Sequence, residues 1–251
     1  KVVVFNKIGE SDVLEIVDQA VPAPQDDEVQ IRVHAIGLNR AEIMFRRGQY
    51  VFQPEFPAKT GYEASGVITQ VGKNVPSHLH LGDSVSIFPG FPIGRWGTYG
   101  EVINIPAKDV INNLKNSSHE ENAALWMQYG TAYGAIVTFA NVQPGQYVVI
   151  RAASSSVGIA AIQIVNALGA IPISITRSED KSHQLIEYGA KYVITSDTQD
   201  IYTEINRIIS ENNGDLHLVF DPVGGKEVTG FVKLVSYGGF FLQYGALDHS
   251  D

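Results

Sequence analysis

The second half of the chain alternates short apolar strands with segments of helical spacing, and this rhythm limits the possible folds more than any other feature. The predicted strands are Tyr147–Ile150, Ile171–Ile175, Tyr192–Ile194, Leu216–Phe220 and Gly239–Tyr244. The predicted helices between them are Val157–Leu168, Lys181–Tyr188, Ile201–Ile209 and Lys226–Val235. Alternation of this kind predicts a parallel sheet with right-handed crossovers, and therefore a doubly wound α/β domain.

The first half has a different pattern. Short strands such as Val2–Phe5, Val29–Ala35 and Gly66–Val71 are separated by turns rich in Pro and Gly. Helical spacing then begins at Ala124–Val137. The sequence therefore predicts a β-rich, barrel-like domain over residues 1–121 and a Rossmann doubly wound domain over residues 122–251.

Charge and composition exclude several classes of function. The chain has 27 acidic residues against 18 Lys and Arg, a net charge of −9, and no basic patch, so we expect no nucleic-acid partner. The absence of Cys excludes disulfides, thiolate zinc sites and a cysteine nucleophile. No apolar run reaches the roughly 18 to 20 residues of a membrane span, and no signal-peptide core is present. We expect a soluble, cytoplasmic protein without a membrane partner.

The turn after the first strand of the α/β half has the layout of a phosphate loop. Small residues, Ser154, Ser155 and Ser156, lead into a helix that starts with Val157 and Gly158. Backbone N–H groups and the helix dipole at such a terminus attract phosphate, and serine is small enough to permit the approach. The alternative is that the serines only cap a buried crossover helix, and this stretch alone leaves both interpretations open.

The end of the second α/β strand indicates which dinucleotide would bind. About eighteen residues beyond Gly158, where the Rossmann pattern usually has a ribose-binding acid, the chain has Thr176 and Arg177. Arg177, with Lys181 one turn further, favours a 2′-phosphate and hence NADP over NAD. Glu179 or Asp180 as the ribose acid is the alternative, but both also fit the first turn of a helix.

A series of motifs, in one order, carries a family resemblance. They are Ile36–Glu42 with Arg46–Tyr50, Gly61–Ile68, Gly97–Glu101, Met127–Tyr133, Ala152–Gly158, Phe220–Gly225 and Tyr244–Leu247. In this order the chain resembles the medium-chain dehydrogenase/reductase superfamily, and within it the zinc-independent quinone oxidoreductase branch. The resemblance implies a GroES-like N-terminal domain and a serine variant of the family's phosphate loop. It also implies hydride transfer from NADPH to a quinone or an α,β-unsaturated carbonyl.

The same resemblance assigns roles to individual residues. The nicotinamide would lie in the cleft between the domains, held by Thr131 and by the backbone near Val223, Gly245, Ala246 and Leu247. Asn39 would orient the nicotinamide ribose or the substrate carbonyl. Tyr50 and Tyr62 would line the cleft and donate a hydrogen bond to the developing enolate. For both tyrosines a packed aromatic wall without a proton role is the alternative.

Departures from the family pattern bear on metal and on assembly. Asn39 and Tyr62 stand near the places where zinc enzymes of the superfamily have Cys and His, so we expect a reaction without zinc. His78 and His80 fit a surface pair in a loop better than a metal site. The family's final segment, with the sixth Rossmann strand, is absent, so we expect these 251 residues to be part of a longer protein that forms a homodimer.

Two other functions stay open at this stage. An NADPH-binding protein without turnover, resembling the crystallin-like or regulatory members of the superfamily, would share every cofactor motif. A methyltransferase-like Rossmann domain is disfavoured by Thr176 and Arg177 and by the β-rich first domain.

Overall fold

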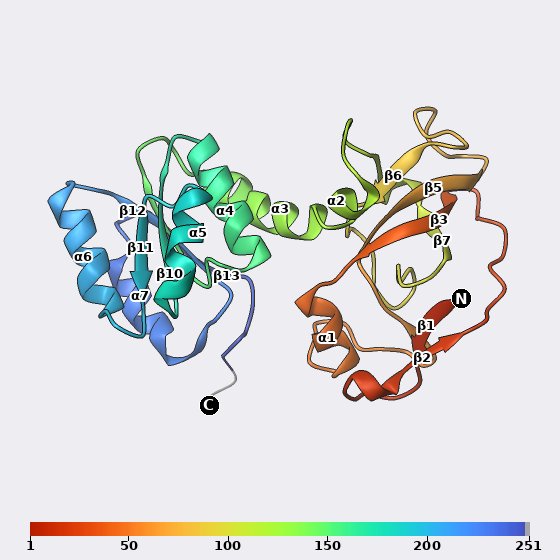
Figure 1. The fold of residues 1–251 in the computed structure, drawn as a ribbon, viewed down its shortest axis with the longest axis horizontal. Coiled ribbons are helices and arrows are strands. Elements are labelled where there is room, and N and C mark those ends of the chain that lie inside the picture. Colours follow the sequence, from red (N-terminus) through yellow and green to blue (C-terminus); the bar gives the residue numbers. More distant parts are fainter. Residues whose placement is uncertain (249–251) are drawn as a thin grey trace. The chain divides into compact units, whose positions relative to one another are not determined.

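The chain forms two compact units, Lys1–Met127 and Gln128–Asp251. The structure is a computed structural model that describes residues 1–248 (Figure 1). Each unit has its own strands and its own apolar core, so each is described by itself. The domain boundaries expected from the sequence, 1–121 and 122–251, stay a prediction.

The first unit contains two antiparallel sheets. The larger has the order β7-β3-β5-β6-β8. The smaller has the order β2-β1-β4. The strands are β1 (Val2–Phe5), β2 (Leu14–Val17), β3 (Glu28–Gly37), β4 (Ala58–Lys59), β5 (Glu63–Val71), β6 (Ser84–Ile87), β7 (Val102–Pro106) and β8 (Val110–Asn112). The predicted β-rich domain is confirmed as a fold.

A single apolar core joins the two sheets of the first unit. Phe5 of β1, Ile31 of β3 and Ile68 of β5 are at most 1% exposed within it. Two short helices, α1 (Arg40–Arg46) and α2 (His119–Ala123), accompany the sheets. Both tryptophans of the chain belong to this unit: Trp96 Nε1 donates to Glu28 at 2.9 Å, and Trp126 Nε1 donates to Ser86 at 2.8 Å.

The second unit is built on a parallel five-stranded sheet of order β11-β10-β9-β12-β13. Its strands are β9 (Tyr147–Ile150), β10 (Ile171–Thr176), β11 (Tyr192–Thr195), β12 (Leu216–Asp221) and β13 (Phe240–Gln243). In sequence numbering within the sheet this is the order 3-2-1-4-5 of a doubly wound dinucleotide fold. The predicted α/β architecture is confirmed.

Helices cover both faces of this sheet. Alternate residues of each strand point to opposite faces, so each strand contributes to two cores. Val148 and Ile150 share a core with α4 (Ser156–Ala167) and α5 (Ser182–Glu187). Tyr147 and Val149 share the other core with α6 (Ile201–Glu211) and α7 (Val228–Leu234). Within the sheet, β10 and β11 follow on one edge of β9, whereas β12 and β13 lie on its other edge. A crevice therefore opens at the carboxyl ends of β9 and β12.

The helical segment predicted at Ala124–Val137 differs from the structure. It is divided into α3 (Trp126–Tyr133) and a π-helical stretch, Gly134–Phe139, with Ala140 N–H bonded to the Ala135 carbonyl at 2.9 Å. Periodicity at 3.6 residues does not separate these two helix types over so short a run.

Candidate functional site

The turn after β9 leads into α4, which begins at Ser156. Ser155 is the N-cap, and its Oγ accepts a hydrogen bond from the Gly158 N–H at 3.1 Å. Ala152 has a φ of +47°, which turns the backbone sharply after the strand. The remaining first-turn N–H groups have no partner within an α-helix, so they are donors for an anion.

Gly158 lets α4 pass directly over this turn. A Cβ atom at this position would lie 2.5 Å from the Ala153 carbonyl oxygen, which no real side chain tolerates. The close packing of helix against loop therefore depends on glycine here.

A cavity of about 680 Å³ opens where the loops after β9, β10, β11 and β12 meet. It brings together most of the cofactor residues predicted from the sequence: Ser154, Ser155, Thr176, Arg177, Lys181, Val223 and Leu247. It is also lined by residues that were not predicted: Arg151, Ala152, Ile175, Ser196, Ile201, Glu227 and Asp248.

The other predicted cofactor residues lie next to this cavity or on another element. Ser156, Val157 and Gly158 form the first turn of α4. Gly245 and Ala246 lie in the segment after β13, where Tyr244 N–H bonds the Asp221 carbonyl at 2.9 Å and Leu247 N–H bonds the Pro222 carbonyl at 3.0 Å. These backbone bonds set the segment beside Val223. Thr131 is half-buried on α3 and is absent from the cavity lining.

The cavity has cations at the end of β10. Arg177 and Lys181 are both exposed and line it, and no acid occupies the position directly after the strand. Ser178 is the N-cap of a 3₁₀ turn, Glu179–Lys181, and its hydroxyl bonds Asp180. Glu179 and Asp180 do not line the cavity, so the acids of this turn face elsewhere.

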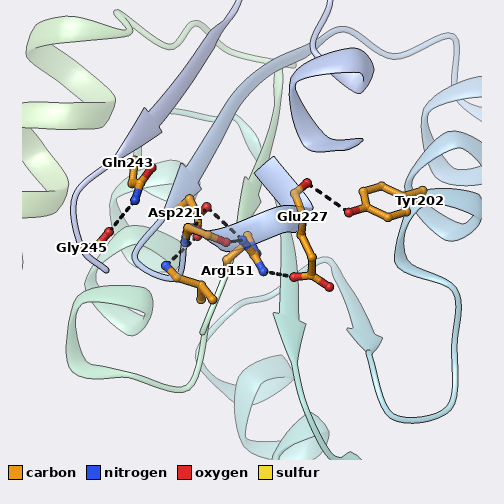
Figure 2. A network of polar contacts seen from close by, with 8 residues as sticks. Arg151, Tyr202, Asp221, Glu227, Gln243 and Gly245 are labelled. Carbon is orange, nitrogen blue, oxygen red and sulfur yellow. Dashed lines mark hydrogen bonds and ion pairs between the residues drawn. The ribbon is translucent and has the colours of Figure 1, made fainter. Parts of the chain in front are cut away.

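A network of ion pairs around the buried Arg151 lies at the switch point, and the sequence did not predict it. Arg151, 4% exposed, donates through Nη1 to Asp221 Oδ2 at 2.9 Å and to the Gly224 carbonyl at 3.3 Å (Figure 2). Its Nη2 pairs with Glu227 Oε2. Asp221 is fully buried and accepts from Val223 N–H at 2.7 Å and from Gly224 N–H at 3.2 Å. The hydrogen bonds of Arg151 thus connect the turn after β12 with the end of β9.

Asn39 in the first unit connects two buried carboxyl groups. Its Nδ2 donates to Glu63 Oε2 at 2.9 Å and lies 3.5 Å from Glu42 Oε1. Glu42 Oε2 accepts from the Asn39 N–H at 2.8 Å and from the Tyr99 hydroxyl at 2.6 Å. Glu63 Oε1 accepts from the Met127 N–H at 2.7 Å. The amide of Asn39 is therefore held in one orientation by acids on α1 and β5.

Burial raises the pKa of both acids above the ordinary value of 4.5. For Glu42 the hydrogen bond from Tyr99 is the largest opposing cause, and for Glu63 it is the backbone bond from Met127. Burial outweighs these bonds because a carboxylate loses most of its hydration in the interior.

Of the two predicted catalytic tyrosines, Tyr62 lies in the core of the first unit and Tyr50 is half-buried against it. Tyr62 is 4% exposed, with its ring 6.3 Å from that of Tyr50 and 6.0 Å from that of Phe91. Burial raises the pKa of the Tyr62 hydroxyl well above its ordinary value of 10.0, which makes it a weaker acid. Asn39 lies on a separate cavity of about 420 Å³ whose lining includes neither tyrosine.

No group of three or more His, Asp or Glu side chains within residues 1–248 is placed to hold a metal ion. His78 and His80 are both exposed, and His80 Nδ1 lies 3.4 Å from Asp83. Over the same residues, no helix combines the length and the apolar character that crossing a membrane requires.

The fold and the cavity together define a class of protein. A 3-2-1-4-5 parallel sheet with a cavity at the start of the first crossover helix has the architecture of a Rossmann dinucleotide-binding domain, and here an antiparallel β domain precedes it in the chain.

Comparisons with known proteins identify the family. Residues 25–115 match the family model of the alcohol dehydrogenase GroES-like domain, and residues 156–251 match that of zinc-binding dehydrogenase. Human quinone oxidoreductase is 30% identical over 229 residues, which cover 91% of this chain and 68% of that protein. The chain belongs to the medium-chain dehydrogenase/reductase superfamily, in its quinone oxidoreductase branch.

Two further relatives show the extent of the similarity. The human synaptic vesicle membrane protein VAT-1 homolog is 32% identical over 226 residues, covering 90% of this chain and 55% of that protein. The chain thus spans about half the length of such relatives. The structure of Escherichia coli quinone oxidoreductase, solved in complex with NADPH, matches with a TM-score of 0.86 at 27% identity, covering all of this chain and 76% of that one.

Proposed function

We propose that this protein is an NADPH-dependent oxidoreductase that transfers hydride to a quinone or an α,β-unsaturated carbonyl. The observation that carries the proposal is the cavity at the strand ends of the second unit. There the start of α4, the serines of the turn and the cations after β10 line one space of about 680 Å³. That volume is of the size expected for a cofactor site.

The residues present fit each charged part of NADPH. The backbone N–H groups of Ser156 and Val157 would bind the pyrophosphate, since they lie in the first turn of α4. Arg177 and Lys181 would bind the 2′-phosphate through charge-assisted hydrogen bonds. The NADPH complex of the E. coli relative supports this choice of cofactor. When bound, NADPH supplies the hydride.

The class of hydride acceptor that we propose follows from the chemistry of the transfer and from the relatives of the chain. Quinones and enones are electron-poor enough to accept hydride without a metal, and one relative is a quinone oxidoreductase. In the first unit, Asn39 would orient the nicotinamide ribose or the substrate carbonyl. Tyr50 and Tyr62 would line the substrate side, where Tyr50 is the more exposed of the two. Thr131, Val223, Gly245, Ala246 and Leu247 would hold the nicotinamide half. A homodimer and a cytoplasmic location stay predictions.

The test is oxidation of NADPH by the purified full-length protein against a panel of quinones and enones. We expect turnover with at least one member of each group, and weaker binding of NADH than of NADPH. Tight binding of NADPH without turnover on any acceptor would favour the alternative of a regulatory or crystallin-like binding protein. Absence of NADPH binding would contradict both.

A further inference from the structure

Two acids, Glu227 and Asp248, line the proposed phosphate cavity, and the fixed position of Glu227 needs an explanation. Glu227 lines it together with Arg177 and Lys181, and the Glu227 side chain is 41% exposed. A carboxylate repels phosphate, so it weakens binding of an anionic ligand unless it faces a hydrogen-bond donor. In a dinucleotide the donors available for such an acceptor are the ribose hydroxyls and the amino groups.

The structure holds Glu227 in a fixed position. Arg151 pairs with its Oε2, and the Tyr202 hydroxyl donates to its backbone carbonyl at 3.1 Å (Figure 2). Arg151 is itself held by Asp221 and lies over the ring of Phe231, 4.5 Å from its centroid. The guanidinium offsets the charge of Glu227 and leaves the other carboxylate oxygen, Oε1, as an oriented acceptor.

Glu227 is anchored to the helix that follows β11, although it belongs to the loop after β12. Its anchor Tyr202 is on α6, the helix that follows β11, and Ile201 and Ser196 from the same connection line the cavity. Arg177 and Lys181 follow the neighbouring strand, β10. An acceptor from the loop after β12 and two cations from the end of β10 therefore line one cavity at the carboxyl ends of the sheet.

We propose that Glu227 accepts a hydrogen bond from the 3′-hydroxyl of the adenosine ribose, beside the 2′-phosphate that Arg177 and Lys181 bind. Arg151 is the positioning residue that orients the Glu227 carboxylate. In a Rossmann domain an acid after the second strand usually binds this ribose. Here Thr176 and Arg177 occupy that place, and Glu227 supplies the acceptor from beyond the fourth strand. The inference rests on the proposed function, because it takes NADPH as the ligand.

The experiment combines a protein change with a ligand change. Binding of adenosine 2′,5′-bisphosphate and of its 3′-deoxy analogue is measured by calorimetry on the full chain and on Glu227→Ala. In the unaltered protein, removal of the 3′-hydroxyl should weaken binding about tenfold, as expected for a hydrogen bond to a charged group. In Glu227→Ala the two ligands should bind within about twofold of each other. Glu211→Ala, an exposed acid of α6 outside the cavity, is the matched control and should keep the tenfold difference.

The Arg151→Lys variant tests the positioning role. It keeps the positive charge but cannot bridge Asp221 and Glu227 with a planar fork. We expect it to lose most of the 3′-hydroxyl preference and to keep its affinity for the 3′-deoxy ligand. If this variant fails to fold, the Glu227→Ala comparison decides by itself.

The possible results separate the two proposals. Equal binding of both ligands by the unaltered protein, or an undiminished preference in Glu227→Ala, would overturn the role of Glu227 and leave the NADPH site standing. Failure of the unaltered protein to bind adenosine 2′,5′-bisphosphate would overturn the proposed function and this inference together.

Discussion

Asn39 shows how a single amide can organise acidic groups that the sequence leaves unconnected. Glu42 is three residues away and Glu63 lies on β5, yet both bond the same side chain. The spacing from Asn39 to Glu42 is visible in the sequence as a helix start. The contact with Glu63 depends on the pairing of β3 with β5, which no local pattern specifies.

The raised pKa of Glu63 predicts a pH-dependent stability of the first unit. In the folded state Glu63 keeps a proton that the unfolded chain releases at lower pH, because burial disfavours the carboxylate. Its contribution to the free energy of unfolding is full below the ordinary pKa of 4.5 and is lost as the pH rises through the folded pKa.

The variant Glu63→Gln removes this titration. The difference in free energy of unfolding, unaltered minus variant, should therefore fall as the pH is raised from 4 to 8. Urea titrations followed by tryptophan fluorescence measure it, since both tryptophans lie in the first unit. A difference that is constant, or that grows with pH, would contradict the prediction.

Arg177 is the residue on which the preference for NADPH depends. Arg177→Ala should weaken NADPH binding by about 1.5 to 3 kcal/mol, the usual contribution of a charge-assisted hydrogen bond, and leave NADH nearly unchanged. Fluorescence titration of both cofactors checks this. Lys191→Ala is a suitable control, because Lys191 is exposed and outside the cavity. Equal affinity of the unaltered protein for NADH and NADPH would refute the assignment.

Among the elements, α4 and the turn before it determine whether phosphate can bind. Gly158→Val should abolish detectable cofactor binding, because the side chain would collide with the Ala153 backbone and push the helix start away. Ser155→Gly should be tolerated, since glycine is itself an acceptable N-cap and costs only a few tenths of a kcal/mol. Calorimetry with NADPH on both variants measures the contrast. Similar affinities in the two variants would show that the loop does not bind the pyrophosphate.

The elements of the α/β half were predictable to within a residue or two, because each strand is a short apolar run between helices. β9 has the predicted bounds Tyr147–Ile150, and β13 is one residue shorter at each end than predicted. The network of Arg151 with Asp221 and Glu227 was not predictable. Arg151 is 70 residues from Asp221 and 76 from Glu227 in the chain, and it meets them only because β9 and β12 are neighbours.

At the scale of the whole molecule, the change in sequence pattern corresponds to two units with separate cores. All residues of the proposed phosphate cavity belong to the second unit. NADPH at one hundred times its Kd should therefore stabilise that unit by about 2.7 kcal/mol. Thermal unfolding followed by the far-UV helical signal checks this, because α4 to α7 lie in the second unit. An unchanged midpoint in the presence of NADPH would count against the site.

The central position of β9 has a consequence for the order of events during folding. β9 can pair with β10 early, but its other neighbour, β12, comes after two further strands and three α-helices. The bond from Arg151 to Asp221 closes a loop of 70 residues. Because a longer loop costs more entropy to close, we expect the crevice between β9 and β12 to be among the last parts of this unit to assemble. In that case a nucleotide would bind only after the rate-limiting step of folding. Its addition should leave the refolding rate unchanged and lengthen the lifetime of the folded protein.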